Sequence, residues 1–210
     1  MKFIYVFDPL CGWCYGFTPV VLQLQQLHST MEFEVLSGGM IAGANKHPWS
    51  SMAAYIQREH TNVEEMTGVK FGPSFLEKLL PSAEMMDSEK PSVALTVFKT
   101  YQPENALSFA HDMQVALNYD GISLNNDDTY RKLIRKFGLP EDEFISKLHE
   151  EHYHQETRQE FDLVHNWGIT GFPAAILDTG GQLYLCARGF MPLDRLQQTI
   201  DKIIQETNSL

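Results

Sequence analysis

Cysteine is scarce in this sequence, with 3 in 210 residues. A scaffold held by disulfides needs more cysteines, in an even number and a shorter chain. Cys11 and Cys14 form one C-x-x-C motif, and Cys186 lies far from them. This distribution favours redox chemistry, or half of a metal site, over structural disulfides.

Basic residues are also few, because 16 Lys and Arg stand against 27 Asp and Glu, for a formal net charge of -11. Nucleic-acid binding needs a basic face, and the sequence contains no Lys/Arg cluster that would form one. An acidic chain is also repelled by anionic membranes. We therefore expect neither nucleic acid nor membrane among its partners.

Long apolar runs are absent as well. The apolar stretch 3–7 ends at Asp8-Pro9, too short to cross a bilayer and without a cleavage site after it. No secretory signal is visible, so we expect a cytoplasmic protein, although a leader removed upstream of residue 1 would overturn that expectation.

The first forty residues predict a β-α-β unit. The segment 2–7 is rich in β-branched and aromatic residues and predicts a buried strand. An apolar stripe predicts a helix over 11–28, and 33–36 predicts a second strand that ends at Gly38-Gly39. Such a crossover normally makes its two strands parallel.

The middle of the chain predicts helices alone. Prolines precede several apolar-periodic segments, Asn126 is a candidate N-cap and Gly138 a candidate C-terminal glycine. No strand candidate of useful length lies here, so we interpret 46–155 as a helical insertion. The predicted helices cover 48–66, 73–80, 91–101, 104–117, 130–137, 140–148 and 155–167.

Strand signals return after Gly171. An apolar strand over 174–177 and a partner over 182–187 flank the turn residues Thr179-Gly180-Gly181, and Pro192 opens a terminal helix. The order β-α-β, helical block, β-β-α predicts an α/β fold.

The C-x-x-C motif lies at the predicted junction of a strand and a helix. Unpaired N–H groups and a partial positive charge at the start of a helix favour a thiolate on Cys11, the form that attacks a disulfide. Cys14, one turn further, would resolve the mixed disulfide. A zinc site would need two more ligands, and no second C-x-x-C exists. We therefore expect no metal. Three histidines lie beside Glu150 and Glu151, and we interpret them as part of a solvated face; they are His149, His152 and His154.

The run Asp8-Pro9-Leu10-Cys11-Gly12-Trp13-Cys14-Tyr15-Gly16-Phe17 resembles the active-site segment of the DsbA-like and FrnE-like thioredoxin-fold oxidoreductases, of the protein disulfide isomerase type. Pro19, eight residues after Cys11, and the run 168–174 resemble further features of that family. The resemblance implies a thioredoxin-like domain of residues 1–45 and 156–210 interrupted by an all-helical insertion over 46–155.

The resemblance also implies a cis bond before Pro173, beside the cysteines. A cis proline leaves the backbone groups of the preceding residue free to pair with an extended substrate peptide. Phe172 and Pro173 are therefore expected to line a substrate groove. A trans proline that starts a strand is the alternative. Trp13 is either part of an apolar peptide platform or part of the core.

One feature departs from the family pattern. Many relatives carry a buried acid on the first strand, six residues before the first cysteine, and Tyr5 occupies that position here. Asp8 is a nearer acid, but its position at the end of the strand argues against a role in proton transfer.

These observations predict a thiol–disulfide oxidoreductase or disulfide isomerase that acts on protein or small-molecule thiols and disulfides, with no cofactor and with glutathione as a conceivable redox partner. Two alternatives stay open. One is a kappa-type glutathione transferase or a 2-hydroxychromene-2-carboxylate isomerase-like enzyme, and the other is a non-catalytic peptide-binding or chaperone module. The sequence leaves the oligomeric state open.

Several methionines suit an adaptable groove or the core, namely Met40, Met52, Met66, Met85 and Met86.

Overall fold

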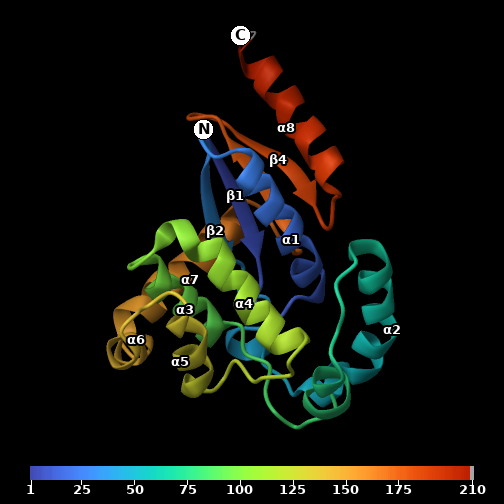
Figure 1. Cartoon of the computed structure of the whole chain (residues 1–210), viewed down its shortest axis with the longest axis vertical. Coiled ribbons are helices and arrows are strands. Elements are labelled where there is room, and N and C mark those ends of the chain that lie inside the picture. Colours follow the sequence, from blue (N-terminus) through green and yellow to red (C-terminus); the bar gives the residue numbers. More distant parts are fainter. Residues whose placement is uncertain (209–210) are drawn as a thin grey trace.

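The computed structural model describes residues 1–208 of the chain. Strands occur only at the two ends of the described chain, and the part between them is helical (Figure 1). Strands and long helices are β1 (Lys2–Phe7), α1 (Gly12–Leu27), β2 (Glu32–Ser37), α2 (Trp49–Thr67), α3 (Glu89–Lys99), α4 (Ala106–Asn118), α5 (Asp127–Arg135), α6 (Glu141–Leu148), α7 (Glu151–Asn166), β3 (Ala174–Asp178), β4 (Leu183–Arg188) and α8 (Leu193–Asn208). Short helical turns are η1 (Gly43–Asn45), η2 (Phe75–Leu79) and η3 (Pro103–Asn105).

One four-stranded sheet joins the two ends of the chain in the order β2-β1-β3-β4. β1 and β2 are parallel, with Lys2 opposite Glu32, whereas β3 is antiparallel to both β1 and β4. The predicted β-α-β and β-β-α units are therefore confirmed, and they meet where β1 pairs with β3.

The side chains of β1 explain its central position. Phe3, Tyr5 and Phe7 are fully buried in the cluster that includes the inner faces of α1 and α8. Ile4 and Val6 point to the other face, where they pack in a second cluster with Val164 of α7. A strand with apolar residues on both faces needs cover on both, and the helices supply it.

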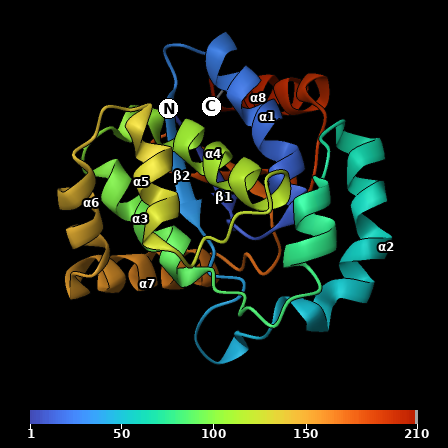
Figure 2. The same cartoon turned by 60° about the horizontal axis from the view of Figure 1, so that its bottom comes forward.

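Most of the helices between the two halves lie below the sheet in Figure 1, with α2 on one side of the molecule and α3, α5 and α6 on the other (Figure 2). Their centre is aromatic, with the rings of Phe98 and Phe109 stacked at 4.3 Å. The last of these helices, α7, starts at Glu151 rather than at 155, because Glu150 is an extended N-cap and Glu151 adds its charge at the positive end of the helix. The predicted boundary between residues 155 and 156 thus falls inside α7.

Two further predicted helices differ in detail. The segment predicted as 73–80 contains the π-type turn η2, in which the Leu80 N–H donates to the Phe75 carbonyl at 2.8 Å. The helix predicted to start at Pro91 starts two residues earlier, because a proline is tolerated in the first turn, where its missing N–H has no partner to lose.

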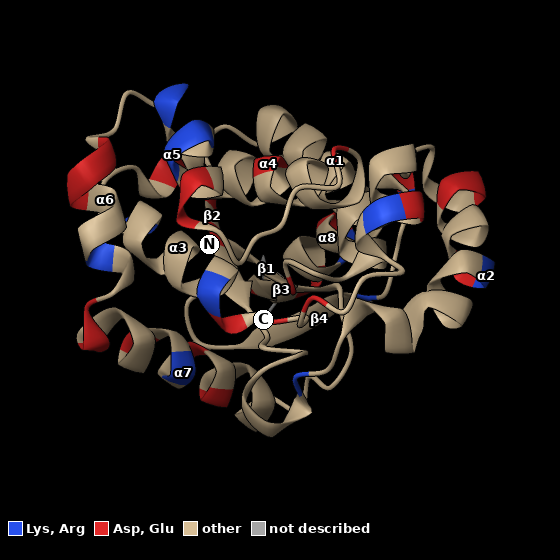
Figure 3. Ribbon diagram, turned by 90° about the horizontal axis from the view of Figure 1, so that it is seen from below, with Lys and Arg blue, Asp and Glu red and all other residues tan. Residues whose placement is uncertain are grey.

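Charged residues of both signs are interspersed along the helices of the insertion, as Figure 3 shows for α2, α5 and α7. Basic side chains pair with acidic neighbours, for example Lys99 with Glu160 at 2.6 Å. No helix within residues 1–208 combines the length and the apolar character that a membrane span requires.

Candidate active site

A tight turn carries the chain from β1 into α1. The Asp8 carboxylate accepts a hydrogen bond from the Leu10 N–H at 2.9 Å, and the Asp8 carbonyl accepts one from the Cys11 N–H at 3.1 Å. Aspartate commonly closes such turns with its own side chain, and Pro9 fixes the backbone between them. The turn places Cys11 directly before the first residue of α1.

Cys11 is the N-cap residue of α1. Its sulfur accepts a hydrogen bond from the Cys14 N–H at 3.3 Å and lies 3.6 Å from the Phe172 carbonyl oxygen, to which the thiol donates. No acidic residue occupies the first turn of the helix, so the positive end of the dipole is not neutralised there. A thiolate on Cys11 would keep the Cys14 hydrogen bond and gain the favourable dipole.

Cys14 is fully buried one turn along the same helix. Burial raises its pKa well above the usual value, and the hydrogen bond and charge of Cys11 act in the same direction. Both cysteines are free thiols in the structure. Cys14 therefore stays protonated, whereas the Cys11 sulfur at the start of the helix accepts a hydrogen bond from the Cys14 N–H, an asymmetry that suits a nucleophile and a resolving thiol.

Asp8 is fully buried behind the dithiol. Its second oxygen accepts from the Met40 N–H at 2.7 Å, and its first also accepts from the Ser88 hydroxyl at 2.9 Å. Burial raises the pKa of Asp8 to about 6, although these hydrogen bonds oppose the shift. Asp8 thus connects the turn before Cys11 to the start of α3.

Tyr5 fills the place of the buried acid with a neutral phenol. Its hydroxyl donates to the Cys14 carbonyl at 3.2 Å and lies 3.0 Å from the Thr18 hydroxyl. The Thr18 hydroxyl also lies 2.7 Å from the side-chain oxygen of Gln114 on α4. Burial raises the pKa of Tyr5 well above its usual value, so this residue fixes the backbone of Cys14 and does not accept its proton.

The loop before β3 faces Cys11. The Phe172–Pro173 peptide bond is cis, Pro173 is buried, and its carbonyl accepts from the Gly189 N–H at 2.7 Å. The Phe172 ring packs against Gly38, where a Cβ atom would lie 1.9 Å from the ring. The glycine at the end of β2 is therefore required for the Phe172 ring to occupy this position.

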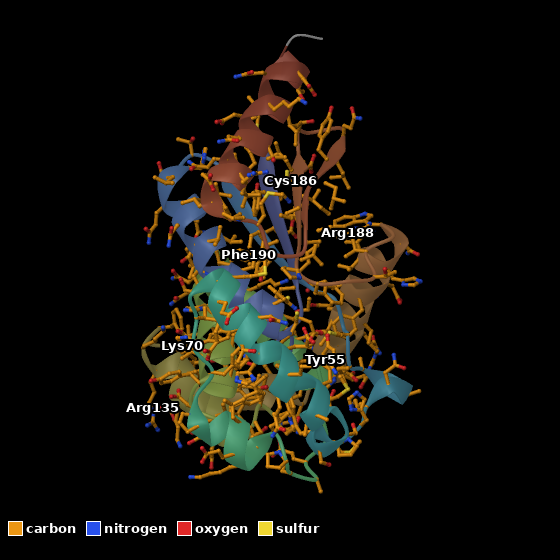
Figure 4. The ribbon with its side chains drawn as sticks, turned by 90° about the vertical axis from the view of Figure 1, so that its right-hand side faces the viewer. Tyr55, Lys70, Arg135, Cys186, Arg188 and Phe190 are labelled. Carbon is orange, nitrogen blue, oxygen red and sulfur yellow. The ribbon has the colours of Figure 1, made fainter. Side chains whose placement is uncertain are left out.

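A cavity of about 260 Å³ opens beside Cys11. Cys11, Trp13 and Phe172 line it together, whereas Cys14 and Pro173 do not. We call it the α2 cavity because that helix forms one wall; Figure 4 views the molecule from this side, with Tyr55 labelled on the helix. Its other lining residues are Leu10, Gly12, Met40, Ile41, Trp49, Met52, Tyr55, Ile56, Glu59, His60, Val63, Phe71, Phe75, Met86 and Asn118.

Apart from Met52, sequence reasoning did not identify the α2 side of this cavity as part of the site. A signal was present, because Trp49, Met52, Ile56 and Val63 recur at helical spacing and predict one apolar face. Periodicity alone does not distinguish a face that fills the core from one that lines a cavity. Of the five methionines considered for a groove, Met40, Met52 and Met86 line the cavity, and Met66 and Met85 are exposed.

The sheet, the inserted helices and a dithiol at the start of α1 define a thioredoxin-like protein of the dithiol class. A family model for the DSBA-like thioredoxin domain matches residues 3–201. The chain therefore belongs to the DSBA-like thioredoxin domain family. No curated protein sequence matches it.

Three solved structures illustrate the similarity. A candidate protein disulfide isomerase from Nitrosomonas europaea is 28% identical with a TM-score of 0.88, covering 98% of this chain and 99% of that one. The cytosolic disulfide reductase DsbM from Pseudomonas aeruginosa is 21% identical with a TM-score of 0.82, covering 98% of this chain and 100% of that one. A 2-hydroxychromene-2-carboxylate isomerase is 14% identical with a TM-score of 0.68, covering 100% of this chain and 98% of that one, and like DsbM it shares the fold.

Proposed function

We propose that the protein exchanges its Cys11–Cys14 dithiol with disulfide substrates. The observation that carries this proposal is the placement of the Cys11 sulfur at the N-cap of α1, with a hydrogen bond from the Cys14 N–H at 3.3 Å. Membership of the DSBA-like family and the likeness to the candidate disulfide isomerase support it.

The exchange proceeds in two displacements. The Cys11 thiolate attacks one sulfur of the substrate disulfide, forms a mixed disulfide and releases the other sulfur as a thiolate. Cys14 then loses its proton, attacks the Cys11 sulfur and releases the second substrate thiolate. The two protons of the dithiol end on the substrate thiols, and the protein carries the Cys11–Cys14 disulfide. Run in reverse, the same steps oxidise a dithiol.

Trp13, Phe172 and Pro173 are the proposed contacts to the substrate. Trp13 and Phe172 line the cavity that Cys11 faces, and the Phe172 carbonyl lies 3.6 Å from the Cys11 sulfur. We further propose that the protein works in the cytoplasm as a reductase or isomerase, with glutathione available as a redox partner. A cytosolic reductase with the same fold, also solved with glutathione, supports this choice.

The test is a redox titration of the protein in glutathione buffers, with free thiols trapped and counted by mass. We expect one two-electron transition that disappears in Cys14→Ser. A midpoint near about -270 mV would indicate a reductant, and one above about -230 mV an isomerase or oxidase. Absence of any internal disulfide over the whole range would refute the dithiol mechanism.

The second candidate function is a glutathione-dependent isomerase or transferase. The fold that the chain shares with a 2-hydroxychromene-2-carboxylate isomerase supports this candidate. That chemistry does not use a resolving thiol. Glutathione-dependent turnover that survives Cys14→Ala would favour it, whereas thiol–disulfide exchange that needs both cysteines would exclude it.

A further inference from the structure

The outer edge of β4 is open to a further strand. Within residues 1–208, β4 pairs with β3 alone, so its other edge presents backbone N–H and C=O groups that have no partner strand. From Leu183 to Ala187 the strand contains neither a charged residue nor a proline, two features that commonly protect an edge. The opposite edge of the sheet, β2, carries the like charges of Glu32 and Glu34. β4 is therefore the edge to which another strand can add.

One face of β4 is uncovered as well. α8 packs on the face that carries Cys186 and Ala187. Beside the other face, beyond the end of α7, lies a groove of about 190 Å³ that Arg188 borders (Figure 4). Leu183 and Leu185 line this groove and are 44% and 49% exposed. An apolar patch that contains tryptophan and arginine is typical of the centre of a protein interface. The lining residues are Trp167, Ile169, Ile176, Leu183, Leu185 and Arg188.

Two opposite charges lie at the two ends of this face. Arg188 is at one end of β4, and Asp178 of β3 lies opposite Leu183 at the other end. Residues directly opposite each other in an antiparallel pair point to the same face, so the Asp178 side chain shares the face of the groove. Its carboxylate accepts a hydrogen bond from the Gly180 N–H at 2.8 Å. Within residues 1–208, neither Arg188 nor Asp178 forms an ion pair.

These two charges are self-complementary about a two-fold axis through the middle of β4. Antiparallel pairing of β4 with β4 of a second copy brings the Arg188 end of each copy to the Asp178 end of the other. The partner's Asp178 is then two strand spacings away across the sheet, about 10 Å. One long arginine side chain and one aspartate side chain that extend toward each other can close this span. The same pairing brings together the exposed leucines of both copies.

We propose that the chain forms a two-fold dimer in which the β4 strands of two copies pair antiparallel and join the two sheets into one, with Arg188 of each copy beside Asp178 of the partner subunit. The net charge of -11 on each copy opposes association in general. The two local charge pairs and the apolar contacts offset this repulsion at one face alone. The surface lies on β4 and not at the dithiol, so the inference does not depend on the proposed function.

The test measures the mass of the full chain by sedimentation velocity over a series of concentrations, in a reducing buffer that prevents intermolecular disulfides. The wild type should move from 24.0 kDa to twice that mass as its concentration rises. Arg188→Glu should raise the dimer dissociation constant by about tenfold or more, because like charges then meet at both pairs. Leu185→Lys should also weaken the dimer. Leu27→Lys, which changes a leucine that is 59% exposed on α1, should leave the dimer unchanged.

The decisive sample is an equimolar mixture of Arg188→Glu and Asp178→Arg. Each variant alone places like charges at both pairs and should stay monomeric. In a mixed dimer, the new acid of one copy faces the new base of the other, and the unchanged Asp178 faces the unchanged Arg188. We therefore expect the mixture to dimerise. Asp178→Asn keeps an acceptor for the Gly180 N–H and should weaken the dimer less than Asp178→Arg does.

Three results would overturn the proposal. The first is a wild type that stays at 24.0 kDa at every concentration. The second is a dimer that none of Arg188→Glu, Asp178→Arg and Leu185→Lys weakens, because its interface then lies elsewhere. The third is a mixture that stays monomeric although circular dichroism shows both variants folded, which rules out the two-fold pairing. If Asp178→Arg does not fold, Arg188→Glu and Leu185→Lys still decide whether β4 is the interface.

Discussion

Asp8 makes the stability of the protein depend on pH in a direction opposite to that of most carboxylates. Its pKa is about 6 in the folded protein and 3.8 in the unfolded chain, because it is fully buried. Between these values the folded protein binds more protons than the unfolded chain, so the free energy of unfolding falls as pH rises. A shift of about 2 units corresponds to about 3 kcal/mol, most of it lost between pH 4 and 6.

The substitution Asp8→Asn removes this titration and keeps one acceptor oxygen for the turn. We expect the difference in unfolding free energy between Asp8→Asn and wild type to change by about 3 kcal/mol from pH 3.5 to pH 7.5, in favour of the variant at high pH. Losing the acceptor for the Met40 N–H adds an offset that does not vary with pH. All other acids titrate in both proteins and cancel.

The assay is urea unfolding of both reduced proteins at half-unit pH intervals, followed by circular dichroism. A difference that stays flat within about 0.5 kcal/mol would refute the reasoning, because it would mean that three hydrogen bonds fully offset the burial of the charge. A difference that moves against the variant at high pH would show that the folded-state pKa lies below 3.8.

Three further predictions concern packing and the third cysteine. Gly38→Ala should displace the Phe172 ring, since the new Cβ would lie 1.9 Å from it, and should lower the free energy of unfolding by about 1–3 kcal/mol. The same variant should slow peptide disulfide exchange more than it slows alkylation of Cys11 by iodoacetamide. Phe98→Ala, at the stacked pair in the inserted helices, should cost about 3–5 kcal/mol in urea unfolding and leave the redox midpoint of the folded protein unchanged. Cys186→Ala should lower the thiol count of the reduced protein by one and leave the two-electron transition in place, because burial raises the pKa of Cys186 to about 11 and keeps it unreactive. A transition that shifts or vanishes in Cys186→Ala would assign this residue to the redox site.

The sequence predicted best where the determinants are local. A β-branched run, the pair Asp8-Pro9 and a cysteine at the start of a helix all act within a few residues of Cys11, and β1, the turn and α1 follow them closely. The N-cap at Asn126 is equally local, and its side chain accepts from the Asp128 N–H as expected.

The parts that sequence reasoning missed depend on contacts between distant residues. Asp8 is buried because Ser88, eighty positions away, packs onto it and donates a hydrogen bond. The α2 cavity is lined by residues that lie far apart in the sequence, namely the start of α1, α2 and Phe172. Neither the depth of a side chain nor the completeness of packing is encoded in a periodic pattern.

Helix α2, which forms one wall of the cavity, buries only a small share of its residues. α2 buries Trp49 and Val63 among its 19 residues, whereas α3 buries eight of its 11. Amide hydrogens of α2 should therefore exchange with solvent through local opening at lower free energy than those of α3. In the proposed exchange, the substrate would lie between the nucleophile at the start of α1 and this sparsely buried helix.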